Sequence, residues 1–236
     1  MSQILDNNKS YSSELSRAFF RNVYTYMFGA LGISGVIAYM VGTNQETFQS
    51  IFITGNSISP LFWVVAFVPV ALGLIIQTAY QRLSMIALIA LFIAYSGLMG
   101  LSLSTIFLVY HIGAIASTFF VAAGAFAGMA ILGYTTKTDL TKFGSLLYMV
   151  FIGMFIAGIV NIFIGSDSMG FIIACLGVFV FTGLTAYHMQ QLKEISNSPA
   201  LTEEDRNKLS LIGGLQLYIL FINLFLSLLR IMGSRD

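Results

Sequence analysis

Four polar side chains stand inside long apolar stretches of the sequence: Asn161, His188, Gln216 and Asn223. A polar group inside a membrane costs free energy, so each of them is a candidate functional residue. Two roles are open to the three amides, which either hydrogen-bond neighbouring helices or line a polar lumen. Gln216 and Asn223 are seven residues apart and therefore share one face of a helix, as residues lining a lumen would.

His188 is a candidate pH sensor, because its ring can change charge near neutral pH. The pKa of a histidine in water is about 6.5, and no other side chain in these stretches titrates in that range. The alternative is that His188, near the end of its stretch, simply reaches interfacial water. We expect no metal site, because metal ligands must cluster and the two histidines and one cysteine lie far apart in the sequence. We also expect no cofactor.

Residues 32–35 (Gly-Ile-Ser-Gly) match the G-x-S-G pattern of rhomboid-type intramembrane serine proteases, which pair the serine with a histidine on another helix. A nucleophile and its base need an approach of roughly 2.6–3.2 Å. Ser34 lies about 13 residues into its stretch, which places it about 20 Å deep. His188 stands within about one turn of the end of its own stretch, and His111 falls in a loop. We therefore predict that the chain is not an enzyme.

The elements that hold these residues are long enough to cross a bilayer. A hydrocarbon core about 30 Å thick needs about 20 apolar helical residues. The chain is 57% hydrophobic and 9% charged, far below the charged fraction of about 25% that is usual in soluble proteins. We predict an all-α membrane protein, a bundle of seven transmembrane helices at residues 20–41, 61–79, 84–110, 114–134, 143–164, 170–190 and 211–231.

The remaining residues are too few for a soluble domain. We predict a cytoplasmic tail at residues 1–19 and a single seven-helix transmembrane domain at residues 20–233. No cleavable signal peptide is expected, because the polar start precedes a stretch too long for a signal sequence. The last helix should begin near Thr202, which is followed by three acids and fits an N-cap with an acid three residues later. A net charge of +1 indicates no nucleic-acid partner.

The placement of lysine and arginine predicts the orientation. Cytoplasmic loops of membrane proteins carry the excess of positive charge. With seven crossings, the cations on the N-terminal side are Lys9, Arg17, Arg21, Arg82, Lys137, Lys142, Lys193, Arg206 and Lys208, and those on the other side are Arg230 and Arg235. We therefore expect a multi-pass protein of a bacterial inner membrane with its N-terminus in the cytoplasm and its C-terminus outside. A re-entrant last span, which would return the C-terminus to the cytoplasm, is the alternative.

Small residues recur at helical spacing in three stretches. They let transmembrane helices approach closely, and packing within the chain is expected rather than dimerisation. The single cysteine, Cys175, is expected to be buried and inert. The small residues are Gly29, Gly32 and Gly35 in the first stretch, Ser96, Gly100 and Ser104 in the third, and Gly124 and Gly128 in the fourth.

Three segments together resemble the Bax inhibitor-1 family, also called the transmembrane BAX inhibitor motif or YccA-like proteins. They are residues 133–140 (Gly-Tyr-Thr-Thr-Lys-Thr-Asp-Leu), 181–187 (Phe-Thr-Gly-Leu-Thr-Ala-Tyr) and 217–225 (Leu-Tyr-Ile-Leu-Phe-Ile-Asn-Leu-Phe). The resemblance covers roughly residues 17–233. It implies six helices around a central seventh, and regulators of calcium leak and stress responses with pH-sensitive bacterial members. YccA itself implies modulation of a membrane-anchored ATP-dependent protease.

The sequence departs from the family where calcium-leaking members carry a pH-sensing pair of aspartates. The matching positions hold His188 and Leu220. Two adjacent carboxylates share a proton because like charges raise one pKa, and a histidine with a leucine cannot reproduce that switch. Calcium also favours six to eight oxygen ligands, carboxylates among them. The resemblance therefore implies the fold, whereas the family's calcium mechanism is not expected to carry over.

Two functions remain open. One is an ion leak, of calcium ions or protons, with His188 as the gate. Its flux should follow one group with a pKa near 6.5 and fall at lower pH, because a protonated His188 repels entering cations. The other is a non-conducting protein whose N-terminal tail and charged loop (residues 191–210) bind a membrane quality-control protease. Apart from such a protease and the conducted ion, membrane lipid is the expected partner.

Overall fold

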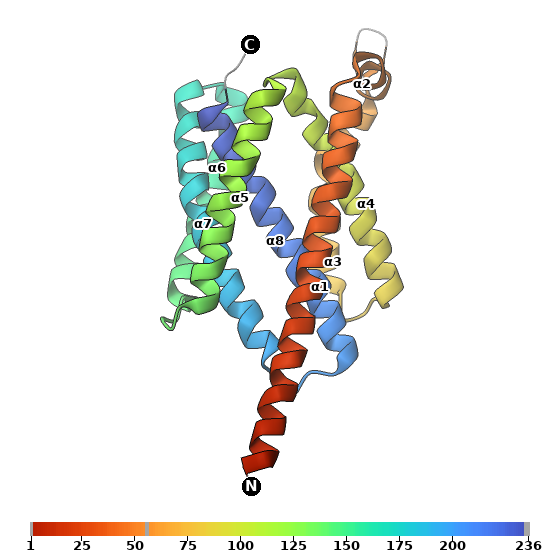
Figure 1. Cartoon of the computed structure of the whole chain (residues 1–236). Helices are drawn as coiled ribbons and strands as arrows, with labels where there is room; N and C mark the ends of the chain where they lie inside the picture. Colours follow the sequence, from red (N-terminus) through yellow and green to blue (C-terminus); the bar gives the residue numbers. More distant parts are fainter. Residues whose placement is uncertain (1, 55–56, 234–236) are drawn as a thin grey trace. The chain divides into compact units, whose positions relative to one another are not determined.

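The computed structural model is almost entirely helical (Figure 1). It describes residues 2–54 and 57–233, with side chains described from residue 14 onward except at residue 58. Arg235 and the side chain of Lys9, both used to predict the orientation, lie outside the described residues. The predicted fold class is confirmed, because seven helices of the described chain are long and apolar enough to cross a membrane: Glu14–Gly42, Pro60–Ala79, Met85–Leu108, Ile112–Thr135, Thr141–Ile164, Asp167–Ser196 and Glu203–Met232.

The chain forms two compact units, whose boundaries cut across the order of the sequence. The first unit contains Met1–Tyr110 and Ser198–Tyr218, and the second contains His111–Asn197 and Ile219–Asp236. The last helix, α8 (Glu203–Met232), therefore contributes its first half to one unit and its second half to the other. The division into a tail and a single transmembrane domain stays a prediction.

In the first unit, α4 packs against both α1 and α3. Local capping sets where its helices begin: the Ser59 and Ser84 hydroxyls accept backbone N–H bonds at the starts of α3 and α4, and Pro60 occupies the first turn of α3. The elements of this unit besides α8 are α1 (Ser2–Gly42), α2 (Gln45–Phe52), the antiparallel strands β1 (Ile53–Thr54) and β2 (Ser57–Ile58), α3 (Pro60–Ala79), α4 (Met85–Leu103) and the 3-10 helix η1 (Ser104–Leu108).

Small residues do bring α1 and α4 together, as predicted for the third stretch. A Cβ placed on Gly100 would lie 2.8 Å from the Ser34 carbonyl oxygen, and Ser96 and Ser104 are fully buried. The same prediction was wrong for the glycines of the first and fourth stretches, because a Cβ on any of them would meet no atom within 4 Å. These glycines are Gly29, Gly32, Gly35, Gly124 and Gly128.

In the second unit, α7 (Asp167–Ser196) packs against both α5 (Ile112–Thr135) and α6 (Thr141–Ile164). Figure 1 shows these three helices side by side in green and cyan. The α6–α7 turn is built by Gly165, whose φ of 66° is the left-handed conformation that glycine adopts without steric cost. Cys175 on α7 is exposed, so its predicted burial was wrong.

The helices differ widely in how much of their surface protein covers. The spanning window of α6 is only 6% buried, whereas that of α8 is 72% buried. The start of α8 was predicted correctly: the Thr202 hydroxyl accepts the Asp205 N–H at 3.1 Å and donates to the Asp205 carboxylate at 2.6 Å. Extensive burial is what a central helix would show, and the central position itself stays a prediction.

Candidate functional site

His188 lies on α7, where it forms a hydrogen bond to a neighbouring helix. The Tyr148 hydroxyl on α6 and the His188 Nε2 atom are 2.6 Å apart. His188 is 5% exposed, and within the described chain its Nδ1 atom is buried without a hydrogen-bond partner. Which nitrogen carries the proton depends on the tautomer, so the site offers either an unpaired N–H or an unpaired lone pair.

Aromatic rings and glycines hold this pair in position. The Tyr187 ring lies 5.5 Å from the His188 ring and 6.3 Å from the Tyr148 ring. Gly144 on α6 makes room for Tyr187, since a Cβ there would lie 2.6 Å from the tyrosine ring. Gly183 on α7 makes room in the same way for the Leu147 side chain. Without side chains at these two positions, α6 and α7 approach closely beside His188.

Two residues beyond His188, Gln190 forms hydrogen bonds to the loop between α5 and α6. Its Nε2 atom donates to the Thr138 carbonyl and its Oε1 atom accepts the Leu140 N–H, both at 2.8 Å. Gln190 is buried, so these bonds satisfy backbone groups that water reaches poorly. Lys193 Nζ donates to the Tyr134 carbonyl at 2.7 Å and lies 5.1 Å from the centre of the Tyr134 ring.

The structure thus brings together two segments that stand about 50 residues apart in the sequence. In the helices themselves, Gly133 of α5 packs directly on Ala186 of α7, so that any Cβ at Gly133 would overlap the Ala186 backbone. The segments 133–140 and 181–187, both part of the resemblance, form one continuous contact region. Sequence reasoning missed Tyr148, Gln190 and Lys193, although Gln190 lies only three residues beyond the second segment.

Asp139 caps this loop at its exposed end. Its Oδ1 atom accepts the Thr141 N–H at 2.8 Å, where α6 begins. Hydrogen bonds from the Thr141 side chain and backbone lower the pKa of Asp139 below its ordinary value, and nearby Lys142 adds to the effect. Asp139 thus contacts the first turn of α6 from the position before the N-cap residue, Leu140.

Two of the other predicted site residues, Asn161 and Asn223, form hydrogen bonds elsewhere in the second unit. Asn161 Oδ1 accepts the Ser166 N–H at 3.1 Å, and this hydrogen bond spans the α6–α7 turn. Asn223 Nδ2 donates to Ile219 of its own helix at 2.8 Å. Gln216 is half-buried in the first unit, whereas Leu220, which the resemblance matches to an aspartate, is buried in the second. A lumen lined by Gln216 and Asn223 stays a prediction.

The site offers proton chemistry rather than metal chemistry. Among the described residues, no three His, Cys, Asp or Glu side chains lie together in a group that could hold a metal ion. The His188–Tyr148 pair can instead accept or release a proton, and in the tautomer whose Nε2–H donates to Tyr148 the unpartnered Nδ1 is the place where that proton would go.

Comparison with known proteins covers nearly the whole chain. The family model described as "Inhibitor of apoptosis-promoting Bax1" matches residues 16–236. A protein of Borreliella burgdorferi is 41% identical over 221 residues, 94% of each chain. The inner membrane protein YbhL of Escherichia coli K12 is 38% identical over 220 residues, 93% of this chain and 92% of YbhL. A protein of Rickettsia prowazekii is 36% identical over 228 residues, 97% of this chain and 94% of its own.

Proposed function

The chain belongs to the Bax inhibitor-1 family of membrane proteins, and from that premise we propose that it is a pH-sensitive ion leak protein of a bacterial inner membrane. The observation that carries the proposal is the buried His188 ring, bonded through Nε2 to Tyr148 while Nδ1 has no partner within the described chain. We propose the orientation that the sequence predicts, with the N-terminus in the cytoplasm, and no enzymatic activity.

The proposed gate works through charge. A second proton on the His188 ring, so that both nitrogens carry one, turns the neutral ring into a cation inside the helix pair. That cation repels entering cations, so the leak falls as the pH falls. Because His188 and Leu220 replace a carboxylate pair, the titration involves one group and no shared proton.

The proposed leak carries calcium ions or protons, and its calcium affinity should be low. Calcium favours several oxygen ligands including carboxylates, and Leu220 supplies none. The matching test is to rebuild the pair: the double variant His188→Asp and Leu220→Asp should increase calcium flux and give it the pH response of two coupled carboxylates.

The proposal is tested by calcium-dye and proton-dye flux into proteoliposomes between about pH 5 and about pH 8, the range that spans histidine titration. Wild-type flux should decrease on acidification, and His188→Ala should remove that dependence. His111→Ala is the matched control, since it removes the other histidine and should leave the pH profile unchanged. Absence of flux in wild-type liposomes, or a strong pH dependence that persists in His188→Ala, contradicts the proposal.

Tyr148→Phe separates a gating role of the pair from simple packing. The variant keeps the ring but removes the hydroxyl that holds His188 Nε2. We expect folded protein whose flux still depends on pH, with a midpoint displaced from that of the wild type, because one partner of the titrating ring has been lost. An unchanged midpoint would mean that Tyr148 only packs beside the histidine.

A second candidate function is that of a non-conducting protein that binds a membrane partner. The exposed charges at the start of α8 indicate which side chains such a partner would present. Arg206 and Lys208 are buried; Arg206 Nη2 donates to the Ser198 carbonyl at 3.2 Å, and Lys208 pairs with Glu204 at 2.8 Å. The charges left exposed at the start of α8 are those of Glu203, Glu204 and Asp205. A partner that binds this segment, such as a membrane-anchored ATP-dependent protease, would therefore present basic side chains.

Crosslinking in native membranes followed by pull-down tests this candidate. Glu203→Lys should abolish the capture of a partner that recognises the acidic turn. Glu46→Lys, which reverses an exposed charge on α2, is the matched control and should capture as the wild type does. Capture that is equal in both variants would exclude this segment as the binding surface.

A further inference from the structure

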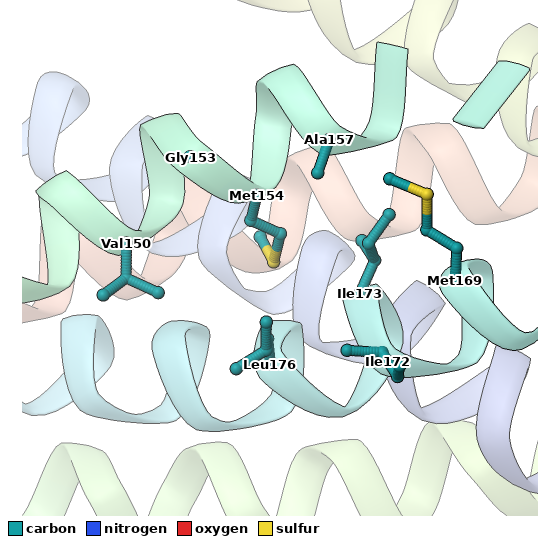
Figure 2. A pocket seen from close by; sticks show the side chains of 8 residues that line it. All are labelled: Val150, Gly153, Met154, Ala157, Met169, Ile172, Ile173 and Leu176. Carbon is teal, nitrogen blue, oxygen red and sulfur yellow. The ribbon is translucent and has the colours of Figure 1, made fainter. Parts of the chain in front are cut away.

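The α6–α7 pair opens into an apolar groove away from His188. Its volume is about 510 Å³, which is within the range of small-molecule sites, roughly 300–1,000 Å³. Each helix contributes four residues at the spacing i, i+3, i+4 and i+7, so two facing stripes form the walls (Figure 2). The lining residues are Val150, Gly153, Met154 and Ala157 of α6, and Met169, Ile172, Ile173 and Leu176 of α7.

The groove exists because side chains that would fill it are missing on α6. Gly153 has no side chain, and a Cβ built there would meet no atom within 4 Å. Ala157, one turn further, contributes a single methyl group. The groove is open at the protein surface and α6 is almost uncovered by protein, so an occupant would enter it from the surrounding bilayer.

The groove is long enough to hold part of one lipid chain within a single leaflet. Residues 150–157 of α6 rise by roughly 10 Å at 1.5 Å per residue. This is shorter than one leaflet of a hydrocarbon core that is about 30 Å thick. Met154 and Met169 line the space, and methionine side chains adapt to ligands of irregular shape.

An arginine packs against α7 next to the residue that begins the groove on this helix, although it is not one of the lining residues. Gly170 directly follows Met169, and a Cβ at Gly170 would overlap the Arg230 guanidinium, which packs there from the last turn of α8. The Arg230 side chain is exposed, and its planar fork matches the geometry of a phosphate group. α6 ends and α7 begins at this level, so the guanidinium lies where a lipid headgroup would be.

We propose that this groove is a phospholipid-binding site, with one acyl chain between the two stripes and the lipid phosphate against Arg230. The two halves of the ligand complement the two halves of the site, hydrocarbon against apolar walls and anion against guanidinium. The proposed polar contact is to the phosphate, which anionic and zwitterionic phospholipids share, so we expect both classes to bind.

Fluorescence quenching by lipids with brominated chains tests the groove. The chain has one tryptophan, so Trp63→Phe with Ile172→Trp places a single reporter at the wall of the groove. Brominated phospholipid at low mole fraction in nanodiscs should quench this reporter beyond the level set by random lipid contact. Quenching at the random level in this reporter protein would overturn the proposal.

Two matched substitutions on α6 separate the groove from the general lipid surface. Gly153→Leu fills the space and should reduce quenching to the random level. Gly158→Leu adds the same side chain at another glycine of α6 with open surroundings, outside the groove, and should retain the quenching. Equal quenching in the two variants overturns the proposal. The proposal is also overturned if the wild-type protein is a dimer in detergent and Gly153→Leu dissociates it. A second copy of the chain would then occupy the groove.

The proposed contact between the lipid phosphate and Arg230 is tested by a separate binding experiment. Arg230→Gln should weaken the apparent affinity for brominated phospholipid about tenfold, as expected for a lost hydrogen bond to a charged group. Brominated diacylglycerol, which has no phosphate, should bind the wild type and Arg230→Gln alike. Arg82→Gln removes an exposed arginine of the first unit and should change nothing. Equal phospholipid affinity in wild type and Arg230→Gln would exclude the arginine from the site.

Discussion

The two ends of the second unit use the same residue type in opposite ways. At the closed end, around His188, Gly133 and Gly144 bring helices into direct contact, because a neighbouring backbone or ring occupies the place of a side chain. At the open end, around the groove, Gly153 has nothing opposite it. A glycine in a transmembrane helix therefore indicates close packing only where the facing helix supplies the matching surface.

The difference between the ends suits the two roles that we propose for them. The closed end carries the hydrogen bonds between elements, from Tyr148 to His188 and from Gln190 to the α5–α6 loop. Bonds of this kind fix ring positions, which a proton-sensitive site requires. The open end presents apolar side chains and a gap, which suit a lipid chain that exchanges with the bilayer.

The largest expected effect is a difference in the free energy of unfolding between two variants that each add one methyl group, one variant at the closed end and one at the open end. Gly133→Ala forces a Cβ into the Ala186 backbone, which cannot move without shifting α7, and should lower the free energy of unfolding by about 3 kcal/mol. Gly153→Ala adds the same group in open space and should stay within about 0.5 kcal/mol of the wild type. Reversible unfolding in mixed detergent micelles gives both values. A similar decrease in the free energy of unfolding in both variants would contradict the difference in glycine packing between the two ends.

An intermediate loss of stability is expected when the hydrogen bonds between Gln190 and the α5–α6 loop are removed. Gln190→Ala leaves the Thr138 carbonyl and the Leu140 N–H without their partner and should cost about 1–3 kcal/mol. Hydrogen exchange should locate the loss at residues 136–140, while the groove residues keep their protection. Gln81→Ala, at an exposed position, is the control. Unchanged exchange in this loop would show that Gln190 does not hold it.

The smallest effect concerns pH at the exposed tip of the same loop. Because the pKa of Asp139 is lowered in the folded state, its contribution to stability is present above the ordinary carboxyl pKa and is lost as the pH falls through the lowered value. Asp139→Asn has no such titration, so its stability should fall less on acidification than that of the wild type. Unfolding measured over a series of acidic buffers decides this. Parallel stability profiles would mean that the contact with Thr141 has no energetic consequence.

The sequence by itself determined the features that depend on local composition. The seven spans follow from continuous apolar stretches, whose cost of exposure to water is a sum over neighbouring residues. The start of α8 follows from Thr202 and Asp205, which meet within one turn and need no other part of the chain. Membership of the family likewise follows from short segments that can be compared residue by residue.

Only the tertiary structure decided which residues meet. His188 was singled out in the sequence, but its partner Tyr148 stands 40 residues earlier on another helix. Gly124 and Gly133 lie on the same helix, and nothing in their local sequence tells that only Gly133 faces a neighbour. The physical reason is that lipid is as apolar as the helix surfaces, so hydrophobicity reveals which segments enter the membrane but not which faces pack together. Close packing and hydrogen bonds between distant residues make that choice.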